Sequence, residues 1–367
     1  MALDRILLAD FRNHARSSIE GMARFNLLVG ENGAGKTNVL EAISLLAPGR
    51  GLRRAGLADM AAQGGGGGFA LSAELASPAG TVQLGTGMRP ERPGRRVVQV
   101  NGAEAPANRL GEWLSIGWLT PAMDRLFVDS AGGRRRFLDR LALALHPGHA
   151  RNASRLETAL RERNRMLSDE REPDPAWFDA IETQIAQAGT AVAEARADML
   201  ERLAGALAVL PDVPFARPAL TYEPGGPTGG EELAATLRAN RARDRAAQRT
   251  LVGPHRDEIA VVMAGKGQRA AECSTGEQKA MLIAIALAHS QVLEDELAQD
   301  GRPRLLLLDE VAAHLDPVRR EALFDRLRGG GAQVWLTGTE LAPFAAIEDE
   351  AAIWRVSEGA LRPLRPG

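Results

Sequence analysis

The sequence has little of several residue types, and each shortage excludes a class of protein. Of its 367 residues only Cys273 is a cysteine, so neither an intrachain disulfide nor a cysteine-based metal site can form. No apolar run is long enough to cross a membrane. The first residues, MALDRILLADFRNH, lack the charged start and long apolar core of a signal peptide. With 45% hydrophobic residues, we expect a globular cytoplasmic protein with no membrane partner.

Excess basic charge and aromatic side chains are also scarce. The formal net charge is −2, and aromatic residues make up 4% of the chain. A nucleic-acid-binding protein of this composition must gather its basic residues into local clusters, because no global positive field exists. The aromatic residues are not interleaved with the basic runs, which argues against base stacking on a single strand and favours contacts with a duplex backbone.

The clearest motif is LLVGENGAGKTNVLEAI at Leu27–Ile43. Gly30 and Gly35 bracket four residues and are followed by Lys36 and Thr37, which is the pattern of a phosphate-binding P-loop. The apolar run before the motif predicts a buried strand, and the helical spacing after it predicts a helix. We expect Lys36 to meet the β- and γ-phosphates of a nucleotide and the Thr37 hydroxyl to bind Mg²⁺.

A second motif, RPRLLLLDEVAAHLD, lies at Arg302–Asp316. Four consecutive leucines are typical of a strand buried on both faces of a parallel sheet. Asp309 and Glu310 then stand at the carboxyl end of that strand, where the ligands of open α/β sheets bind. We expect Asp309 to hold Mg²⁺ and Glu310 to act as the general base that polarises the attacking water.

The region between the motifs has a helical pattern. Apolar spacing predicts a helix over about 152–167 and a longer one over 175–199 with a coiled-coil-like seam. Pro173 and Pro175 act as breakers between them, so the pair is expected to form an antiparallel hairpin. A further helix is expected over 231–248. We therefore expect three parts: 1–145 with the P-loop, a helical arm over 146–250, and 251–367 with the second motif.

A short polar loop, Ser274–Gly276, precedes a strongly apolar helical run. Such a loop can bind an anion at the helix N-terminus. Alternatively, Ser274 or Thr275 is a simple N-cap, with Gln278 near the capping-box position. The order of the motifs favours the anion, because a P-loop, this loop, the strand with Asp–Glu and then HLD follow one another as in an ATP-binding-cassette head.

This order and several local segments resemble the RecF family, recombination mediators that are short-armed relatives of the SMC chromosome proteins. The segments that carry the resemblance, nearly end to end, are LADFRNH, GRGLRR, RRRFLDR, RERNRML, GPHRDEI and LLDEVAAHLDPVRREAL. The resemblance implies an α/β fold: an ABC-ATPase-like head of the SMC/RecF type with an inserted, mainly helical arm (lobe II). It also implies ATP and Mg²⁺ as cofactors.

In heads of this kind the signature loop meets the nucleotide held by a second copy, so that two ATP molecules lie between two heads. The resemblance therefore implies nucleotide-binding residues from both copies: Gly30, Asn32, Gly33, Gly35, Lys36, Thr37 and Asn38 from one, and Ser274 and Gly276 from the other. Lys36 and Glu310 are the expected catalytic residues, and Thr37 and Asp309 the expected Mg²⁺ ligands.

The sequence departs from the cassette pattern at several positions. Thr275 stands where the commonest signature has glycine, and no glutamine occupies the Q-loop position near Ala122. The last strand, AQVWLTGTE, has no switch histidine, which leaves Thr337 or Thr339 to contact the γ-phosphate. Missing γ-phosphate contacts suit a slow timer, so we expect a weak, DNA-stimulated ATPase.

The family's role implies ATP-dependent binding to DNA at duplexes and at duplex–single-strand junctions of gaps. RecR, and indirectly RecO and RecA, are the implied protein partners, and ATP is expected to drive a homodimer that slow hydrolysis releases. The candidate DNA contacts lie in three arginine clusters: Arg50 and Arg53, Arg134 and Arg135, and Arg241 and Arg243. A cassette-type regulator or transporter motor is the alternative, although it gives the arm no obvious role.

Overall fold

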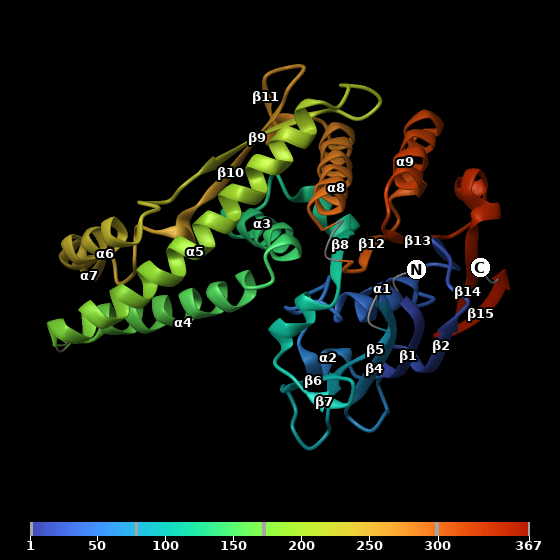
Figure 1. The fold of residues 1–367 in the computed structure, drawn as a ribbon, viewed down its shortest axis with the longest axis horizontal. Coiled ribbons are helices and arrows are strands. Elements are labelled where there is room, and N and C mark those ends of the chain that lie inside the picture. Colours follow the sequence, from blue (N-terminus) through green and yellow to red (C-terminus); the bar gives the residue numbers. More distant parts are fainter. Residues whose placement is uncertain (1–2, 78–79, 171–173, 298–300, 366–367) are drawn as a thin grey trace. The chain divides into compact units, whose positions relative to one another are not determined.

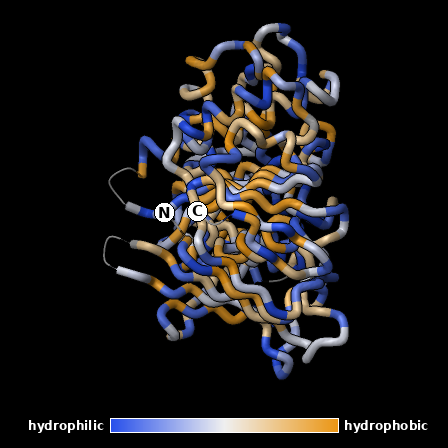
Figure 2. Tube along the Cα trace, turned by 90° about the vertical axis from the view of Figure 1, so that its right-hand side faces the viewer, coloured by the Kyte–Doolittle hydropathy of each residue, from blue (hydrophilic) through white to orange (hydrophobic). Residues whose placement is uncertain are grey.

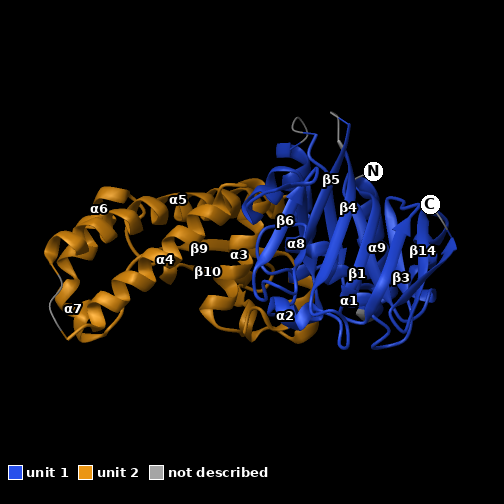
Figure 3. Ribbon diagram, turned by 90° about the horizontal axis from the view of Figure 1, so that it is seen from below, with its two compact units in different colours: residues 1–124, 211–215, 282–367 blue, residues 125–210, 216–281 orange. Residues whose placement is uncertain are grey.

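The computed structural model describes residues 3–77, 80–170, 174–297 and 301–365 (Figure 1). The chain forms two compact units, which Figure 3 colours separately. Unit 1 comprises residues 1–124, 211–215 and 282–367, and unit 2 comprises 125–210 and 216–281. These borders differ from the expected ones at 145 and 250, so the separate arm over 146–250 stays a prediction. Among the described residues, no helix is long and apolar enough to span a bilayer.

Unit 1 contains an antiparallel six-stranded sheet in the order β2-β1-β4-β5-β6-β7. Its strands are β1 (Leu3–Phe11), β2 (His14–Glu20), β4 (Phe69–Ser77), β5 (Gly80–Met88), β6 (Arg96–Val100) and β7 (Ala103–Glu104). Leu3, Ile6, Leu8 and Phe11 of β1 are all buried, which places one face of that strand in the core. The sheet thus has a buried face and a more polar face, as an antiparallel sheet permits.

The second sheet of unit 1 is mixed, in the order β15-β14-β3-β13-β12-β8. Its strands are β3 (Phe25–Val29), β8 (Ser115–Leu119), β12 (Arg304–Leu308), β13 (Gln333–Gly338), β14 (Ala351–Ser357) and β15 (Ala360–Arg365). All neighbours pair in parallel except β15, which pairs antiparallel with β14. The four leucines of β12 are buried between β13 and β8, which confirms the strand predicted from them.

Helices and short 3₁₀ turns connect the strands of unit 1. They are α1 (Lys36–Ser44), α2 (Leu57–Met60), residues 282–297 of α8 (Thr275–Leu297), α9 (Pro317–Gly329) and the turns at 107–112, 121–125, 312–314 and 342–350. Apolar residues of the two sheets and of α1 form one core, and in Figure 2 the apolar colour runs mainly through the interior of the chain trace.

A buried arginine joins the end of α1 to the six-stranded sheet. Arg96 of β6 donates hydrogen bonds to the carbonyl oxygens of Leu45, Ala47 and Gly49, just beyond the last turn of α1. Cations are favoured at the negative end of a helix dipole. Burial lowers the pKa of Arg96 to about 10, so its side chain stays charged at neutral pH. The P-loop helix is therefore fixed at its far end as well as at the loop.

Unit 2 is mainly helical and has a small antiparallel sheet in the order β11-β10-β9. Its helices are α3 (Ala131–Leu145), α4 (His149–Ser168), α5 (Pro175–Ala208), α6 (Gly230–Ala239), α7 (Arg241–Ala246) and the first residues of α8 (Thr275–Leu297). Its strands are β9 (Pro218–Glu223), β10 (Glu258–Met263) and β11 (Gln268–Arg269).

The predicted helical hairpin is confirmed by α4 and α5, which lie side by side (Figures 1 and 3). Leu156 and Leu160 of α4 share a buried cluster with Ile181 and Ile185 of α5 and with Leu233 of α6. The 34 residues of α5 correspond to about 50 Å at 1.5 Å per residue. The spacing that predicted the seam therefore marks the residues that pack.

Of two expectations about helix ends, one was confirmed and one was wrong. The helix expected over 175–199 begins at Pro175, where proline is favoured because no intrahelical N–H bond is needed, and it is separate from α4. Asp174 caps that helix by accepting a hydrogen bond from Ala176 N at 2.8 Å. Pro173 lies outside the described residues. The single helix expected over 231–248 is divided at Asn240, which ends α6 and precedes α7.

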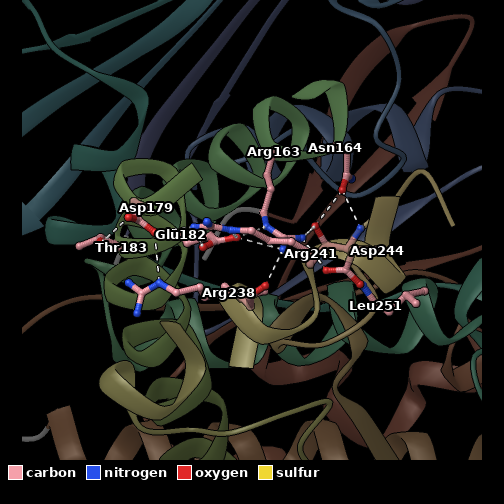
Figure 4. A network of polar contacts seen from close by, with 11 residues as sticks. Arg163, Asn164, Asp179, Glu182, Thr183, Arg238, Arg241, Asp244 and Leu251 are labelled. Carbon is pink, nitrogen blue, oxygen red and sulfur yellow. Dashed lines mark hydrogen bonds and ion pairs between the residues drawn. The ribbon is translucent and has the colours of Figure 1, made fainter. Parts of the chain in front are cut away.

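A buried ion cluster connects three helices of unit 2 (Figure 4). Arg163 of α4 is fully buried and donates to Glu182 of α5 at 3.1 Å and to Asp244 of α7 at 2.6 Å. Its remaining bonds go to Thr250 and to the carbonyl oxygen of Leu237. Because every partner is itself buried or part-buried, the cluster fixes the relative positions of α4, α5 and α7.

We predict that Arg163→Met lowers the free energy of unfolding by about 3–5 kcal/mol, because two buried carboxylates would lose their shared cation. Urea titration followed by circular dichroism measures the loss. Arg161→Met is the matched control, because Arg161 lies exposed on the same helix. Equal losses in the two variants would contradict the role of the cluster.

Candidate nucleotide site

The phosphate loop joins the end of β3 to the first turn of α1. The N–H of Gly30 donates to the carbonyl oxygen of Gly338 in β13 at 3.2 Å. A Cβ atom at residue 30 would lie 2.1 Å from the carbonyl oxygen of Val356 in β14, so only glycine fits. Gly35 has φ 115°, a backbone conformation that favours glycine. The two glycines let the loop pass close to β13 and β14 and then turn into α1.

Lys36 lies inside the loop. Its Nζ donates to the carbonyl oxygens of Gly30 at 2.7 Å and Glu31 at 2.8 Å. An ammonium has three N–H donors, so one is left for a ligand. Burial lowers the pKa of Lys36, while the carboxylates of Glu310 and Asp309 raise it in part. The lysine is therefore held in place, with a cationic end near two acidic side chains.

Asp309, which follows β12, contacts helix α1 and strand β13. Thr37, in the first turn of α1, donates its hydroxyl to both carboxylate oxygens of Asp309 at 2.9 and 3.0 Å. Thr337 of β13 donates to Asp309 Oδ1 at 2.8 Å. Burial raises the pKa of Asp309, and the two hydroxyl donors offset part of that rise. The predicted neighbours Thr37 and Asp309 are thus brought together, with Thr337 beside them.

Glu310 directly follows Asp309 and has an unusual backbone. Its φ is 53°, in the left-handed region that is rare for a residue with a side chain. The backbone N–H of Glu310 donates to Thr337 Oγ1 at 2.8 Å, which holds this conformation. Of the two threonines considered from the sequence, Thr337 is buried in the acidic site, whereas Thr339 is exposed.

Two residues that were not predicted from the sequence form hydrogen bonds with carbonyl oxygens of the loop. Asn13 donates from Nδ2 to the carbonyl oxygen of Ala34 at 3.0 Å, and His14 Nε2 lies 3.1 Å from the carbonyl oxygen of Gly35. His14 is fully buried, and burial lowers its pKa, so a neutral imidazole donates that bond. Both residues belong to LADFRNH, but nothing in their spacing pointed to the P-loop.

A second layer of contacts involves the expected ligand Asn38. It donates to Asn13 Oδ1 at 2.7 Å and accepts from Arg53 Nη1 at 2.6 Å. Arg53 also lies 3.3 Å from Glu41, a fully buried carboxylate that Arg12 pairs with through two bonds of 2.8 and 2.9 Å. Glu41 therefore anchors two arginines against α1.

The other expected phosphate contacts are less constrained. Asn32 and Gly33 are exposed at the tip of the loop. Ser274 and Gly276 belong to unit 2, where Ser274 precedes α8. A capping box is present there, as one alternative predicted, but its partner is Glu277: Ser274 N and Oγ both donate to Glu277 Oε2 at 2.9 Å. Gln278 instead donates to the carbonyl oxygen of Cys273, so its expected role as the box residue was wrong.

The two arginines of unit 1 that are proposed to contact DNA differ in their bonding partners. Arg50 is exposed. Arg53 is bound to Asn38 and shares buried Glu41 with Arg12, so its side chain already has partners.

The arginines of unit 2 differ in the same way. Arg134 pairs with Glu258 at 2.5 Å, and Arg135 donates to a backbone carbonyl. Arg241 pairs with two carboxylates of α5, whereas Arg243 is exposed. Exposed Arg243 is therefore better placed to meet an added anion.

The residues present fit ATP and Mg²⁺. Gly30 lets the loop pass against β14, the positive φ of Gly33 and Gly35 turns the loop into the N-terminus of α1, and Lys36 retains a donor. Thr37 and Asp309 supply the oxygen donors that Mg²⁺ prefers. Within the described ranges no group of three or more His, Cys, Asp or Glu forms a metal cage. Mg²⁺ is commonly held by one or two side chains together with phosphates and water.

Comparison with known proteins identifies the family. The family model described as RecF/RecN/SMC N terminal domain matches residues 2–356. The DNA replication and repair protein RecF of Mesorhizobium japonicum is 46% identical over 380 residues, covering 98% of this chain and 97% of that protein. The chain belongs to the RecF family. The RecF protein of Rhizobium leguminosarum bv. trifolii is 43% identical and covers 98% of each chain.

Solved structures show the same fold. The structure of the recombination mediator protein RecF with ATP, from the RecFOR pathway, has a TM-score of 0.86 at 22% identity and covers 99% of this chain and 97% of that one. An Smc head domain from Pyrococcus yayanosii, with a coiled coil and joint, has a TM-score of 0.55 at 15% identity and also covers 99% of this chain. The expected SMC/RecF ATPase head fold is confirmed.

We predict that Thr337→Val lowers the free energy of unfolding by about 1–3 kcal/mol, because buried Asp309 and the Glu310 N–H would each lose a hydrogen-bond partner. Chemical denaturation of the nucleotide-free protein measures the change. Thr339→Val is the matched control at an exposed position of the same segment. If both variants unfold as the unaltered protein does, the Thr337 bonds contribute nothing to stability.

Proposed function

We propose that this chain is an ATP-dependent DNA-binding recombination mediator and a slow ATPase. The observation that carries the proposal is the convergence of Lys36, Thr37, Asp309 and Glu310 on one site. Membership of the RecF family supports the biological setting and argues against the alternative of a transporter motor. The RecF structure described for the RecFOR pathway was solved with ATP, which supports ATP as the nucleotide.

The proposed chemistry is attack of water on the γ-phosphorus with release of ADP and phosphate. Lys36 directs its free N–H at the phosphates, and Thr37 and Asp309 hold Mg²⁺. Bound Mg²⁺ supplies positive charge that offsets the charge of the phosphates. Glu310 accepts the proton of the attacking water, and Thr337 fixes the peptide from which that carboxylate extends.

The proposed dimer places Ser274 and Gly276 of one copy against the nucleotide held by the other. Each ATP then touches both copies, so hydrolysis removes part of the interface and releases the dimer. Such an arrangement is isologous: the same two surfaces meet twice around a two-fold axis. The rate of ATP hydrolysis would then set the lifetime of the dimer, and slow hydrolysis would give a long-lived dimer.

DNA binding is proposed to depend on the dimer, because two copies of each basic cluster double a charge that one copy lacks. The backbone of a duplex carries the contacts, so sequence has little influence. Arg50 and Arg243 are the preferred contacts, since Arg53, Arg134 and Arg241 already have carboxylate partners. Arg135 remains a weaker candidate. RecR, and through it RecO and RecA, are the proposed partners at gapped DNA, with RecA loading as the outcome.

We expect Lys36→Ala to abolish nucleotide binding, because the charge facing the phosphates is lost. Glu310→Gln should bind ATP, form persistent dimers and turn over at least about 10²-fold more slowly, because only water activation is removed. Fluorescent-nucleotide titration, light scattering and phosphate release measure the three properties. An unchanged mass in saturating ATP and Mg²⁺ would refute the dimer, and normal turnover by Glu310→Gln would show that another group positions the water.

We expect DNA affinity to require ATP and to fall steeply with salt. Arg50→Glu should weaken binding on all sequences and flatten the log–log salt slope by about 0.9 for each phosphate that the variant no longer neutralises. Arg53→Glu is a poorer test, because it would place a new carboxylate beside buried Glu41. Anisotropy titrations at two salt concentrations, with and without ATP, measure the effect. Arg362→Glu at an exposed site outside the clusters is the control for net charge. Equal binding with and without ATP would contradict the coupling.

A further inference from the structure

The first turn of α8 contains a chain of polar contacts that reaches a lysine on a neighbouring hairpin. Ser274 Oγ donates to Glu277 Oε2 at 2.9 Å, and the Glu277 N–H donates back to Ser274 Oγ at 3.3 Å. The other carboxylate oxygen, Oε1, lies 2.5 Å from Nζ of Lys266. Lys266 stands in the turn between β10 and β11, where its N–H and that of Gly267 both donate to the Met263 carbonyl oxygen. The turn therefore fixes where the lysine side chain begins.

This arrangement conflicts with the role proposed for Ser274. A serine hydroxyl has one proton to donate, and here Glu277 accepts it. An ionised γ-phosphate oxygen can only accept, so Ser274 must give up the bond to Glu277 before it can donate to the phosphate. The carboxylate would also stay close to an incoming anion and repel it. Glu277 is therefore an obstacle to the phosphate unless its charge is offset and its position controlled.

Lys266 is the residue that meets this need. Its ammonium lies 2.5 Å from Glu277 Oε1, and that hydrogen bond is the largest cause of a lowered pKa of about 2 for Glu277. The chain has 45 lysine and arginine residues, and only Lys36, Lys266 and Lys279 are lysine. Two of these three compact cations thus lie within the segment 266–279 that contains the signature loop. Lysine presents a point charge, whereas arginine presents a planar fork.

We propose that Lys266 is a positioning residue for nucleotide in trans: it holds Glu277 and offsets its charge, so that Ser274 can transfer its hydroxyl hydrogen bond to the γ-phosphate of the ATP bound by a second copy. This inference rests on the proposed ATP-dependent dimer. Lys266 acts through Glu277 rather than by touching the nucleotide. When the second copy leaves, Ser274 returns to the capping box.

A purely structural role predicts something different. The Lys266 side chain is 55% exposed, and exposed ion pairs contribute little to stability. Glutamine also completes a capping box, so Glu277→Gln retains the cap while removing the charge. If the pair only supported the fold, changing either residue would leave ATP-dependent association as it was.

The test measures the protein concentration at half-dimerisation in saturating ATP and Mg²⁺, by light scattering. We expect Lys266→Gln to raise that concentration roughly tenfold, because an unmatched carboxylate then faces each phosphate in the interface. Glu277→Gln should associate at least as well as the unaltered protein, and adding it to Lys266→Gln should restore association. The half-dimerisation concentration of Lys266→Arg should lie between those of the unaltered protein and Lys266→Gln. Nucleotide affinity of the monomer and the melting temperature should not change in any of them.

Arg269→Gln is the matched control, because it removes one positive charge from the same hairpin and leaves the Lys266–Glu277 pair in place. The inference would be overturned if Lys266→Gln had the same half-dimerisation concentration as the unaltered protein. A double variant as weak as Lys266→Gln alone would also overturn it, since Lys266 would then not act through Glu277. If light scattering shows that the unaltered protein stays monomeric in saturating ATP and Mg²⁺, the proposed dimer itself is wrong. This outcome is distinct from a failure of the Lys266 inference, because it does not involve the variants.

Discussion

The carboxylate of Asp309 is the contact on which the arrangement of the site depends. It accepts hydrogen bonds from the hydroxyl of Thr37, in the first turn of the helix after the P-loop, and from that of Thr337, near the end of the neighbouring strand. Segments that are hundreds of residues apart in the chain are thereby held together at the carboxyl ends of two inner, parallel strands of the mixed sheet. Without this acceptor the two hydroxyls would lose their common partner, and the threonine that holds the Glu310 peptide would itself be less firmly placed.

The P-loop beside this carboxylate is held by contacts from within the protein. Lys36 donates two of its N–H groups to loop carbonyl oxygens. Asn13 and His14 form hydrogen bonds with two further loop carbonyl oxygens. These four carbonyls are therefore satisfied from inside, as are the N–H groups of Gly30 and Ala34, so an anion would meet other N–H groups of the loop. A preformed cradle of this kind lowers the ordering cost of binding.

Much of this could be predicted from sequence, because the relevant signals are local. The glycine spacing marked the P-loop, four leucines marked a strand buried on both faces, and Asp309 and Glu310 had to follow at its end. What could not be predicted depends on tertiary partners. Nothing near Arg53 in the sequence indicates that it contacts buried Glu41, because that pairing needs the fold around α1. Likewise, Glu277 and Gln278 are both suitable capping-box residues, and only the backbone geometry decides between them.

The left-handed backbone of Glu310 sets stability against activity at a single position. A side chain in that conformation typically costs about 1–3 kcal/mol, and glycine would remove the cost. The fold carries this strain at the one residue proposed to activate water, directly after a strand whose leucines are buried in ordinary extended backbone. A screen that selected this protein for heat resistance alone would therefore favour glycine at position 310, and would obtain a more stable protein that lacks the proposed general base.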